Sequence, residues 1–311
     1  MSTITDRTAG GSGGADVAFR RGTPEDSRAC FDVFLEAVVD LSRRIGAPWQ
    51  AEPEREWTRF EPLYRRIGDH AAEWWVAEDS ASGELIGYAR SILRGGLFEL
   101  TEFFVHPHRQ AAGVGRRLLE LAFSPDRGDV RVIVATPDLR ALSRYYRAGT
   151  VARFPIVSLT GAPSPADDLS GVEAVVARTD DIPTLVELER AVLEFDRGTE
   201  EFAWLLEQRE GYIYRRDGRA IGLGFIGRSG TGPILALDSA DQRPILLHLE
   251  ARAHALGRAE VGFEVPMIDE VAVLHLLRRG FRMDQFLTLL LSSRPFGKFD
   301  RFIPFSPTFV L

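Results

Sequence analysis

The sequence predicts an α/β (α+β) fold made of two tandem domains, each with a mixed, mostly antiparallel central sheet flanked by helices. Segments with the apolar alternation of strands are interleaved with segments whose apolar residues recur at helical spacing. The order of segments in the first half of the chain returns in the second half. This repeat is far longer than the ~20–50 residues of a solenoid unit, so it indicates duplication of a whole domain.

Length and composition set the class of protein. The chain has 311 residues, of which 45% are hydrophobic, which is enough for a large core and for two domains. No apolar run approaches the ~20 residues that a membrane span needs. Residues 1–16 are rich in Ser, Thr and Gly, and we expect a disordered tail rather than a signal peptide. We therefore expect a cytoplasmic protein with no membrane partner.

Charge and cysteine content narrow the function further. The formal net charge of −7 argues against nucleic acid as a partner, because nucleic-acid binding needs a basic face. Cys30 is the only cysteine, which excludes an intramolecular disulfide and a thiolate metal site. Its apolar neighbours predict a buried, unreactive thiol.

The first half of the chain begins with a strand at Val17–Arg21. A helix follows, with Thr23 suited to the N-cap and Pro24 to the first helical position. A looser helical stretch covers residues 45–73. The further elements are a hairpin over 74–90, strands at 99–105, 130–136 and 151–159, and a helix at 139–148. Residues 161–170, with Gly161, Pro163 and Pro165, read as the linker between a first domain, 17–160, and a second, 171–311.

A glycine-bearing turn joins the strand at 99–105 to the next helix. The turn spans residues 110–115, and apolar residues return at helical spacing from Leu118. The first N–H groups of a helix have no intrahelical partner, and the helix dipole adds positive charge there, so this end can hold a phosphate. Arg116 and Arg117 add charge for a diphosphate. Two glycines alone fit an ordinary strand-to-helix turn equally well.

Two motifs resemble the GNAT superfamily of acetyltransferases. The loop Gln110-x-x-Gly113-x-Gly115, just after a strand that ends Phe-Val-His-Pro, is similar to the coenzyme A loop of that family. The second motif is the family's Asn-x-x-Ala-x-x-x-Tyr-x-x-x-Gly helix, reproduced here by Asp138, Ala141, Tyr145 and Gly149. Asp138 replaces the usual Asn and Thr150 the usual Phe, which weakens a ligand contact from position 138 but not the placement of the helix.

The resemblance implies an N-acetyltransferase that uses acetyl-CoA as co-substrate and moves the acetyl group to a primary amine of a small molecule. No metal is implied, and His106 and His108 flank a proline without a third ligand nearby. The positions that match the family's coenzyme A contacts are Val105, Gln110, Ala111, Ala112, Gly113, Val114, Gly115, Arg116 and Asp138.

The resemblance also implies two catalytic side chains. Tyr145 would protonate the departing thiolate, although its position also suits a core tyrosine. Glu102 would act as general base, with Glu99 as the alternative. Positions three apart face opposite ways on a strand, and Glu102 lies nearer the expected acetyl position. A surface carboxylate on a strand edge stays an open reading. A backbone N–H near Val105, freed by a bulge, would meet the oxyanion.

The second half repeats the first but lacks its chemistry. Gly83–Gly87 matches Gly218–Gly222, an offset of 218 − 83 = 135. The helix motif returns with an offset of 280 − 149 = 131, as Asp269, Ala272, Leu276 and Gly280. Across the loop, the same offset places Asp241, Pro244 and Leu246 opposite Gln110, Gly113 and Gly115. A carboxylate repels phosphate and a proline has no N–H, so we expect a degenerate second domain and one coenzyme site per chain.

Three questions stay open in the sequence. Residues 45–73 hold Trp49, Trp57 and several Glu and Arg residues. They form either a solvated helix pair or, because this region is often the substrate lid in the family, an aromatic and acidic pocket for a cationic amine. The aromatic tail 295–311 reads as an arm packed over its own domain or across the domain junction. The alternative function is a non-catalytic acyl-CoA-binding or sensing protein, and the chain is expected to be a monomer or homodimer.

Overall fold

The computed structural model describes residues 17–46, 48–109, 113–166, 168–227 and 230–305. Gln110, Ala111 and Ala112 of the expected coenzyme A loop and the tail 1–16 therefore lie outside the described residues. The described chain divides into two compact units. Unit 1 takes the residues up to Leu93, Phe98–Ile133 and Asp138–Thr150, and unit 2 takes Arg94–Leu97, Val134–Pro137 and the residues from Val151 onward.

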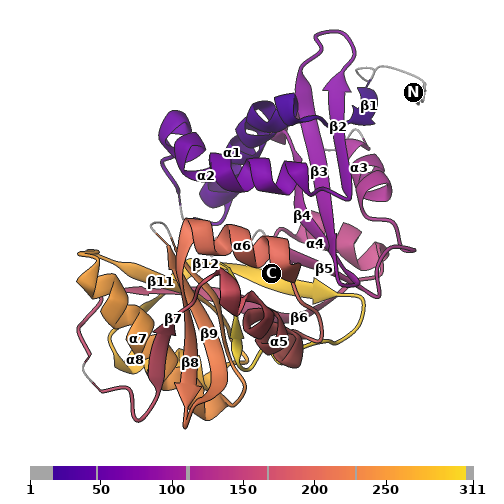
Figure 1. Ribbon diagram of the computed structural model, residues 1–311. Coiled ribbons are helices and arrows are strands. Elements are labelled where there is room, and N and C mark those ends of the chain that lie inside the picture. The colour runs from indigo at the N-terminus through magenta and orange to yellow at the C-terminus, as the bar shows by residue number, and fades with distance from the viewer. Residues whose placement is uncertain (1–16, 47, 110–112, 167, 228–229, 306–311) are drawn as a thin grey trace. The chain divides into compact units, whose positions relative to one another are not determined.

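Unit 1 contains the predicted sequence of strands and helices (Figure 1). Its sheet has the order β1-β2-β3-β4-β5, in which β1 and β3 both pair antiparallel with β2. The elements are β1 (Val17–Arg21), α1 (Ser27–Arg44), α2 (Pro53–Asp69), β2 (Glu73–Asp79), β3 (Leu85–Arg94), β4 (Leu97–Val105), α3 (Val114–Ala122), β5 (Val130–Ala135) and α4 (Leu139–Arg147).

Local sequence explains how the first helix starts. Thr23 and Asp26 form a capping box, in which the N–H of Thr23 donates to Asp26 Oδ2 over 2.8 Å. Pro24 occupies the first turn, where its missing N–H costs nothing. Arg20 on β1 donates to Asp26 from two nitrogens, at 2.7 and 2.8 Å, so the same carboxylate ties the helix start to the sheet.

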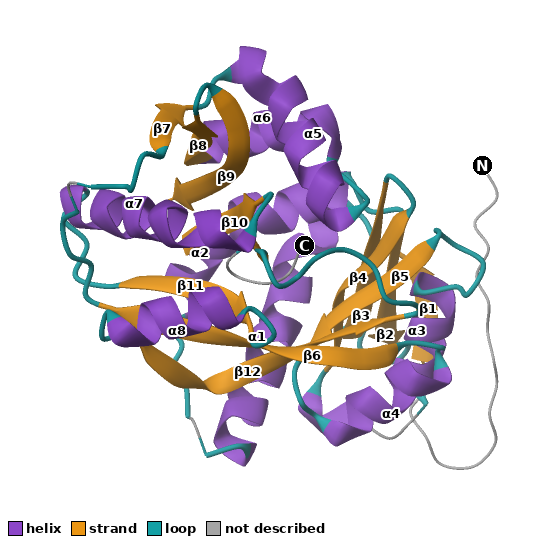
Figure 2. Ribbon diagram, turned by 90° about the horizontal axis from the view of Figure 1, so that it is seen from below, coloured by secondary structure: helices purple, strands orange, loops and turns teal. Residues whose placement is uncertain are grey.

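The two faces of the unit 1 sheet carry different helices. α1 and α2 cover one face, where the ring centroids of Phe34 and Phe104 lie 5.1 Å apart. The hydroxyls of Tyr64 on α2 and Tyr88 on β3 are 3.0 Å apart on this same face. α3 covers the other face, where Ser91 Oγ donates to the carbonyl of Ala122 over 2.7 Å (Figure 2). Alternation along β3 therefore sends Tyr88 to one layer and Ser91 to the other.

From β7 to α8, unit 2 repeats the helix and strand order of unit 1, and its strands form two groups. One sheet has the order β13-β10-β9-β8-β7, and β6 lies between β12 and β11 with antiparallel pairing on both sides. The elements are β6 (Val151–Gly161), β7 (Glu173–Val176), α5 (Ile182–Leu193), α6 (Gly198–Gln208), β8 (Arg209–Arg216), β9 (Arg219–Gly227), β10 (Gly230–Ala236), α7 (Gln242–Ala255), β11 (Val261–Pro266), α8 (Glu270–Arg278), β12 (Arg282–Ser292) and β13 (Phe302–Ile303).

The position of β6 differs from the expected domain boundary. The sequence predicts Val151–Leu159 as the last strand of a first domain that ends at residue 160. In the structure β6 pairs with β11 and β12, and the compact division places it in unit 2. Alternation predicts a strand but carries no information on which sheet supplies its partners, because those partners lie far along the chain.

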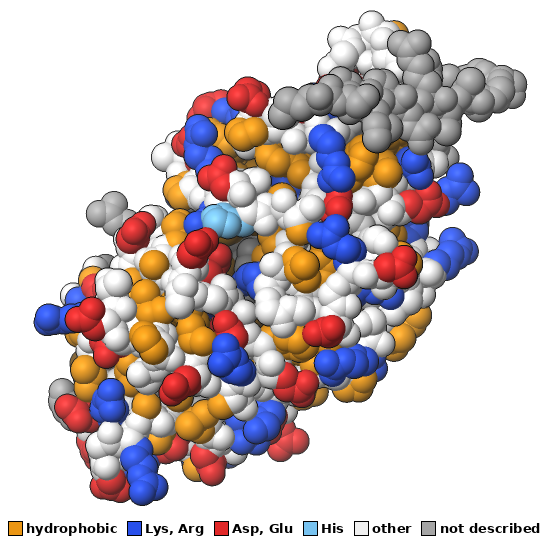
Figure 3. All heavy atoms as spheres, turned by 45° about the vertical axis from the view of Figure 1, so that its right-hand side comes forward, with side chains coloured by type: hydrophobic (Ala, Val, Ile, Leu, Met, Phe, Trp, Pro, Cys, Tyr) orange, Lys and Arg blue, Asp and Glu red, His pale blue; other side chains and the backbone are white. Residues whose placement is uncertain are grey.

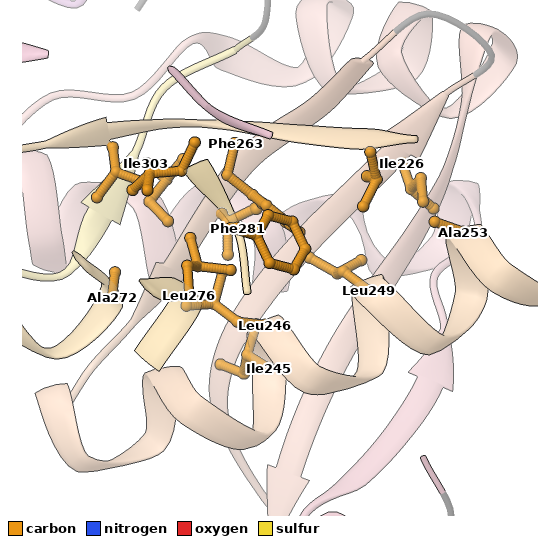
Figure 4. Close-up of a cluster of buried hydrophobic side chains, with 14 of the residues drawn as sticks. Ile226, Ile245, Leu246, Leu249, Ala253, Phe263, Ala272, Leu276, Phe281 and Ile303 are labelled. Carbon is orange, nitrogen blue, oxygen red and sulfur yellow. The ribbon is translucent and has the colours of Figure 1, made fainter. Parts of the chain in front are cut away.

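The core of unit 2 lies between the helices α7 and α8 and the strands they cover (Figure 4). Leu246 and Leu249 from α7, Leu276 from α8 and Phe281 just before β12 turn toward one another in this cluster. Leu246, Leu249 and Leu276 are fully buried. The helices therefore pack directly on the sheet through apolar side chains.

The C-terminal arm packs on unit 2, as its aromatic composition predicts. β13 pairs antiparallel with β10, with Ile303 opposite Ile234 and Phe302 opposite Leu235. The buried aromatic residues of the arm are Phe296, Phe299, Phe302 and Phe305. The arm is thus part of the core rather than a surface extension.

Phe302→Ala should destabilise the protein by about 3–5 kcal/mol, because it removes a fully buried ring and leaves a cavity. Lys298→Ala, an exposed change in the same arm, should stay within about 0.5 kcal/mol. Urea denaturation of both variants tests this. Equal stability of the two variants would show that the arm adds nothing to the fold.

Candidate functional site

The site is built around the start of α3. Gly113 is the N-cap at φ +82°, a conformation that favours glycine, and the first helical hydrogen bond runs from the N–H of Arg117 to its carbonyl over 3.1 Å. The N–H groups of Val114, Gly115 and Arg116 therefore have no acceptor within the helix. Together with the helix dipole they make an end that suits an anion.

Glycine is required at position 115 for a different reason. A Cβ there would lie 3.2 Å from Phe103 Cζ and 3.6 Å from Val105 Cγ2. The first turn of α3 thus lies close against the end of β4, where a larger side chain would push the helix away. The first turn of α3 therefore lies beside Val105 on β4, one of the residues predicted to contact coenzyme A.

The segment before the helix is held from two sides. His106 Nε2 lies 2.6 Å from Glu36 Oε2 on α1, and Arg109 Nη2 lies 2.6 Å from Asp79 Oδ2 at the end of β2. Asp79 also accepts from the N–H of Ala81 over 2.9 Å. His106 is therefore engaged with a carboxylate, and no group of three His, Cys, Asp or Glu within the described ranges could hold a metal ion.

The predicted oxyanion donor near Val105 stays a prediction. Val105 is the last residue of β4, and the N–H of the next residue, His106, donates to the carbonyl of Ile86 over 2.8 Å. Pairing with β3 therefore continues to the end of β4. Of the two arginines at the helix start, Arg116 has a side chain that is 80% exposed, and Arg117 lies 3.6 Å from Glu120.

Tyr145 lies on α4 and faces the same strand. Its ring is 5.9 Å from the ring of Phe103 in an edge-on arrangement, so Tyr145 and Gly115 both adjoin Phe103. Among the described residues its hydroxyl has no hydrogen-bond partner, whereas its carbonyl accepts from Thr150 Oγ1 over 2.9 Å. Burial raises the pKa of Tyr145, so the hydroxyl keeps its proton at neutral pH.

Asp138 caps α4. One carboxylate oxygen accepts from the N–H of Arg140 over 2.9 Å, and the other lies 3.0 Å from Arg44 Nη2. Burial acts to raise the pKa of Asp138, but these hydrogen bonds outweigh it and hold the pKa below its ordinary value. Both oxygens are thus engaged, and a coenzyme contact from this side chain stays a prediction.

Glu102 is buried inside a polar network. Tyr88 Oη donates to one carboxylate oxygen over 3.0 Å, and Arg90 Nε donates to the other in an ion pair whose two side chains are fully buried. Arg90 Nη1 also donates to the carbonyl of Tyr64 over 2.9 Å. Glu99 is only 1% exposed and Glu102 2%, so the reading of either as a surface carboxylate is wrong.

This network bears on the predicted general base. Both carboxylate oxygens of Glu102 already accept hydrogen bonds, one from the Tyr88 hydroxyl and one from the Arg90 guanidinium. The role of Glu102 as base stays a prediction. Sequence reasoning missed Arg90 and Tyr88, and the available signal was an arginine in the middle of the apolar strand Leu85–Arg94.

Glu102→Gln should cost about 3–5 kcal/mol of unfolding free energy, because it leaves the Arg90 guanidinium buried without its anion. Glu120→Gln, which removes an exposed partner of Arg117, should cost about 0–1 kcal/mol. Chemical denaturation compares the two. If both variants were as stable as the wild type, the buried pair would not be a structural constraint.

The second unit has a helix where the first has its glycine-bearing turn. In unit 1 a short 3-10 helix ends at Arg109 and α3 begins at Val114. In unit 2 the matching 3-10 helix ends at Asp241 and α7 begins at once, at Gln242. The ungapped offset of 131 holds on both sides, because β4 and β10 end at 105 and 236 and β5 and β11 begin at 130 and 261, so Pro244 opposite Gly113 lies in the first turn of a helix that starts earlier.

The expectation of a missing anion cradle still follows. The cap of α7 is Asp241, a carboxylate that lies 2.7 Å from Arg216, and Pro244 removes the N–H of the third helical position. Leu246 belongs to the buried core, and so does Leu276 at the position that matches Tyr145. At these two positions unit 2 therefore has buried apolar side chains where unit 1 has predicted site residues.

Asp269 caps α8 as Asp138 caps α4, but it is fully buried. Burial raises the pKa of Asp269 to about 7, although the N–H of Ala272 and the amide of Gln242 donate to the carboxylate. An unfolded carboxyl titrates near pH ~4, so between pH ~4 and 7 the folded chain holds a proton that the unfolded chain releases.

The contribution of Asp269 to stability is therefore complete below pH ~4 and is lost as the pH rises through 7, with a total of the order of 4 kcal/mol. Asp269→Asn should flatten the fall in the thermal midpoint between pH 5 and 8 relative to wild type. Asp238→Asn, a change at an exposed cap, should keep the wild-type slope. An unchanged slope in the Asp269 variant would contradict the assignment.

Comparison with known proteins supports the same fold. Residues 70–149 match the model of the acetyltransferase (GNAT) domain. No curated protein matches the chain in sequence. Among solved structures, a putative acetyltransferase from Pyrococcus horikoshii is similar at a TM-score of 0.69 and 18% identity, with 92% of each chain covered.

Two further structures agree. A GCN5-related N-acetyltransferase from Sphaerobacter thermophilus gives a TM-score of 0.61 at 16% identity, covering 90% of this chain and 96% of that chain. A tandem GNAT protein from the clavulanic acid biosynthesis pathway gives 0.57 at 16% identity, covering 90% and 99%. The chain thus has the fold of GNAT acetyltransferases, and the resemblance drawn from the two motifs is confirmed.

The tandem GNAT protein is matched over nearly its whole length, and the acetyltransferase domain model covers residues 70–149 of this chain. The predicted α/β architecture with mostly antiparallel sheets is confirmed as well. Within the described ranges, no helix combines the length and apolarity needed to cross a membrane.

Proposed function

We propose that this protein is an acetyl-CoA-dependent N-acetyltransferase that acts on a primary amine of a small molecule through a single site in unit 1. One observation carries the proposal: the open start of α3 and the buried hydroxyl-bearing ring of Tyr145 both adjoin Phe103 on β4. Unit 2 has neither the loop nor the hydroxyl at the matching positions. The N-acetyltransferase named among the similar structures supports the reaction class.

Different residues of unit 1 are proposed to bind the acyl donor and to donate the proton. The N–H groups of Val114, Gly115 and Arg116 would hold the diphosphate of the acyl donor, and the exposed Arg116 guanidinium would turn toward it from Glu120, which lies 3.8 Å away. Attack by the amine on the thioester breaks the carbon–sulfur bond, and the thiolate that leaves must gain a proton. Tyr145 would supply it, because burial keeps the hydroxyl protonated and no described residue takes its hydrogen bond.

Glu102 is the proposed acceptor of the amine proton, and Tyr88 would have to carry that proton to it. The Tyr88 hydroxyl donates to Glu102 and adjoins the hydroxyl of Tyr64, which makes a short chain of exchangeable protons. Alternatively, a water molecule near the acceptor site would carry the amine proton to Glu102. In both cases Arg90 holds the carboxylate in place.

The burial of Glu102 also favours a second candidate, a non-catalytic acyl-CoA-binding or sensing protein. Such a protein would need the start of α3 but no base. As partner we propose a small amine and not nucleic acid. On the face drawn in Figure 3, basic and acidic side chains are interspersed, so that face offers no field of one sign.

Tyr145→Phe tests the catalytic proposal. It should lower the turnover of acetyl-CoA with a responsive amine by about 10–1000-fold, because the thiolate loses its proton donor, and leave the affinity for acetyl-CoA nearly unchanged. Release of free thiol across a panel of amines measures turnover. Calorimetry measures affinity and should find one acetyl-CoA per chain.

Tyr146→Phe is the matched control, because Tyr146 is its neighbour and is half exposed. Unchanged turnover in the Tyr145 variant would remove its role as acid. Binding of acetyl-CoA without thiol release for any amine would select the non-catalytic candidate. Two sites of similar affinity would contradict the assignment to unit 1.

A further inference from the structure

One side of α2 carries an acid where the pattern calls for an apolar residue. The buried positions of this helix are Glu56, Phe60, Leu63, Tyr64 and Ile67. They recur at helical spacing and form the stripe that faces α1 and the sheet. Glu56 is only 9% exposed, so a carboxylate lies at the start of an otherwise aromatic and aliphatic stripe.

The carboxylate of Glu56 is poorly satisfied. Its Oε2 is buried and accepts no hydrogen bond from any described residue. The cation recorded beside it, Arg59 Nη1, lies 3.7 Å away, which is beyond hydrogen-bond reach. A buried carboxylate without donors costs free energy, and such a group in a native protein is completed by a bound water, an ion or a ligand, or serves a functional role.

The contacts of Arg59 indicate which kind of chemical group binds beside Glu56. Its guanidinium carbon lies 5.2 Å over the ring of Phe60, and its side chain is 47% exposed. A cation therefore already lies from the solvent side between an aromatic face and the Glu56 carboxylate. An ammonium group has the same two affinities, for the π face and for the anion, and is small enough to approach Oε2 closely.

Aromatic contacts connect this position to β4. The rings of Phe60 and Phe34 are 6.0 Å apart, and those of Phe34 and Phe104 are 5.1 Å apart. Phe104 lies on the α1–α2 face of β4, whereas its neighbours Phe103 and Val105 face α3. Glu56 thus lies one helical turn from an aromatic cluster that reaches the α1–α2 face of β4.

We propose that Glu56 and the face of Phe60 form a subsite for the ammonium group of a cationic amine, which displaces Arg59 when it binds. That this amine is the acetyl acceptor rests on the proposed function. The binding of a cation at this subsite does not depend on the proposed function. Glu56 is a specificity-determining residue and takes no part in the transfer step.

Two pairs of probes test the subsite: phenethylamine with phenethyl alcohol, and hexylamine with hexanol. Within each pair the molecules have similar size and only the amine is charged at neutral pH. Calorimetry or ligand-observed NMR on the full chain should show that each amine binds wild type about tenfold or more tightly than its alcohol. Glu56→Gln should abolish this preference, and Arg59→Gln should keep or increase it.

Glu61→Gln is the control, because it makes the same charge change on the same helix, where Glu61 pairs with Arg65 over 2.7 Å. It should keep the preference. Glu56→Gln should not lower the thermal midpoint, since it removes a poorly satisfied buried charge. A purely structural role would make the variant less stable and leave the binding preference unmoved.

The outcomes separate this proposal from the enzymatic one. Equal binding of amine and alcohol to wild type, binding of neither, or an unchanged preference in Glu56→Gln overturns the subsite. If the amines bind with the expected preference and acetyl-CoA also binds, but no thiol is released, the subsite stands and the acetyltransferase proposal fails.

Discussion

The buried guanidinium of Arg90 is the constraint on which unit 1 depends. It is fully buried and lies within 4.7 Å of the ring of Tyr64, 4.9 Å of Trp74 and 5.6 Å of Tyr88. A charge in such surroundings needs an anion beside it, and the groups around the guanidinium come from α2, β2, β3 and β4, although Arg90 Nη2 has no hydrogen-bond partner among the described residues. The side chain therefore fixes how the helix layer and three strands meet. The acid expected to do chemistry is also the anion that balances this charge.

The two copies of the fold show what a ligand site requires of a sequence. In unit 1 the short 3-10 turn ends at Arg109 and the helix α3 begins at Val114. In unit 2 the helix α7 begins directly after the matching turn, and Leu246 and Leu276 at the matching positions belong to the apolar core. Apolar packing stabilises the second copy, whereas the first keeps glycines and a buried hydroxyl that packing alone does not need.

Much of the fold could be predicted from the sequence because its signals are local. Alternation, helical spacing and the N-cap at Thr23 gave the order of elements, and two spaced motifs singled out Gly115 and Tyr145. The partner of Glu102 could not be predicted, because it depends on which face of β3 carries Arg90. The partners of β6 and the earlier start of α7 were also missed, since strand pairing over long separations and the exact first turn of a helix leave no clear local pattern.

The place of β6 in the sheet has a consequence for biosynthesis. Its neighbours β11 and β12 begin at Val261 and Arg282, so a strand made midway through translation has no template until the far end of the polypeptide emerges. During that interval both of its edges expose unpaired amide and carbonyl groups to any other strand nearby. Yield in a cell should therefore depend on how fast the ribosome reaches the codons for residues 261–292, and on the chaperones that shield β6 until then.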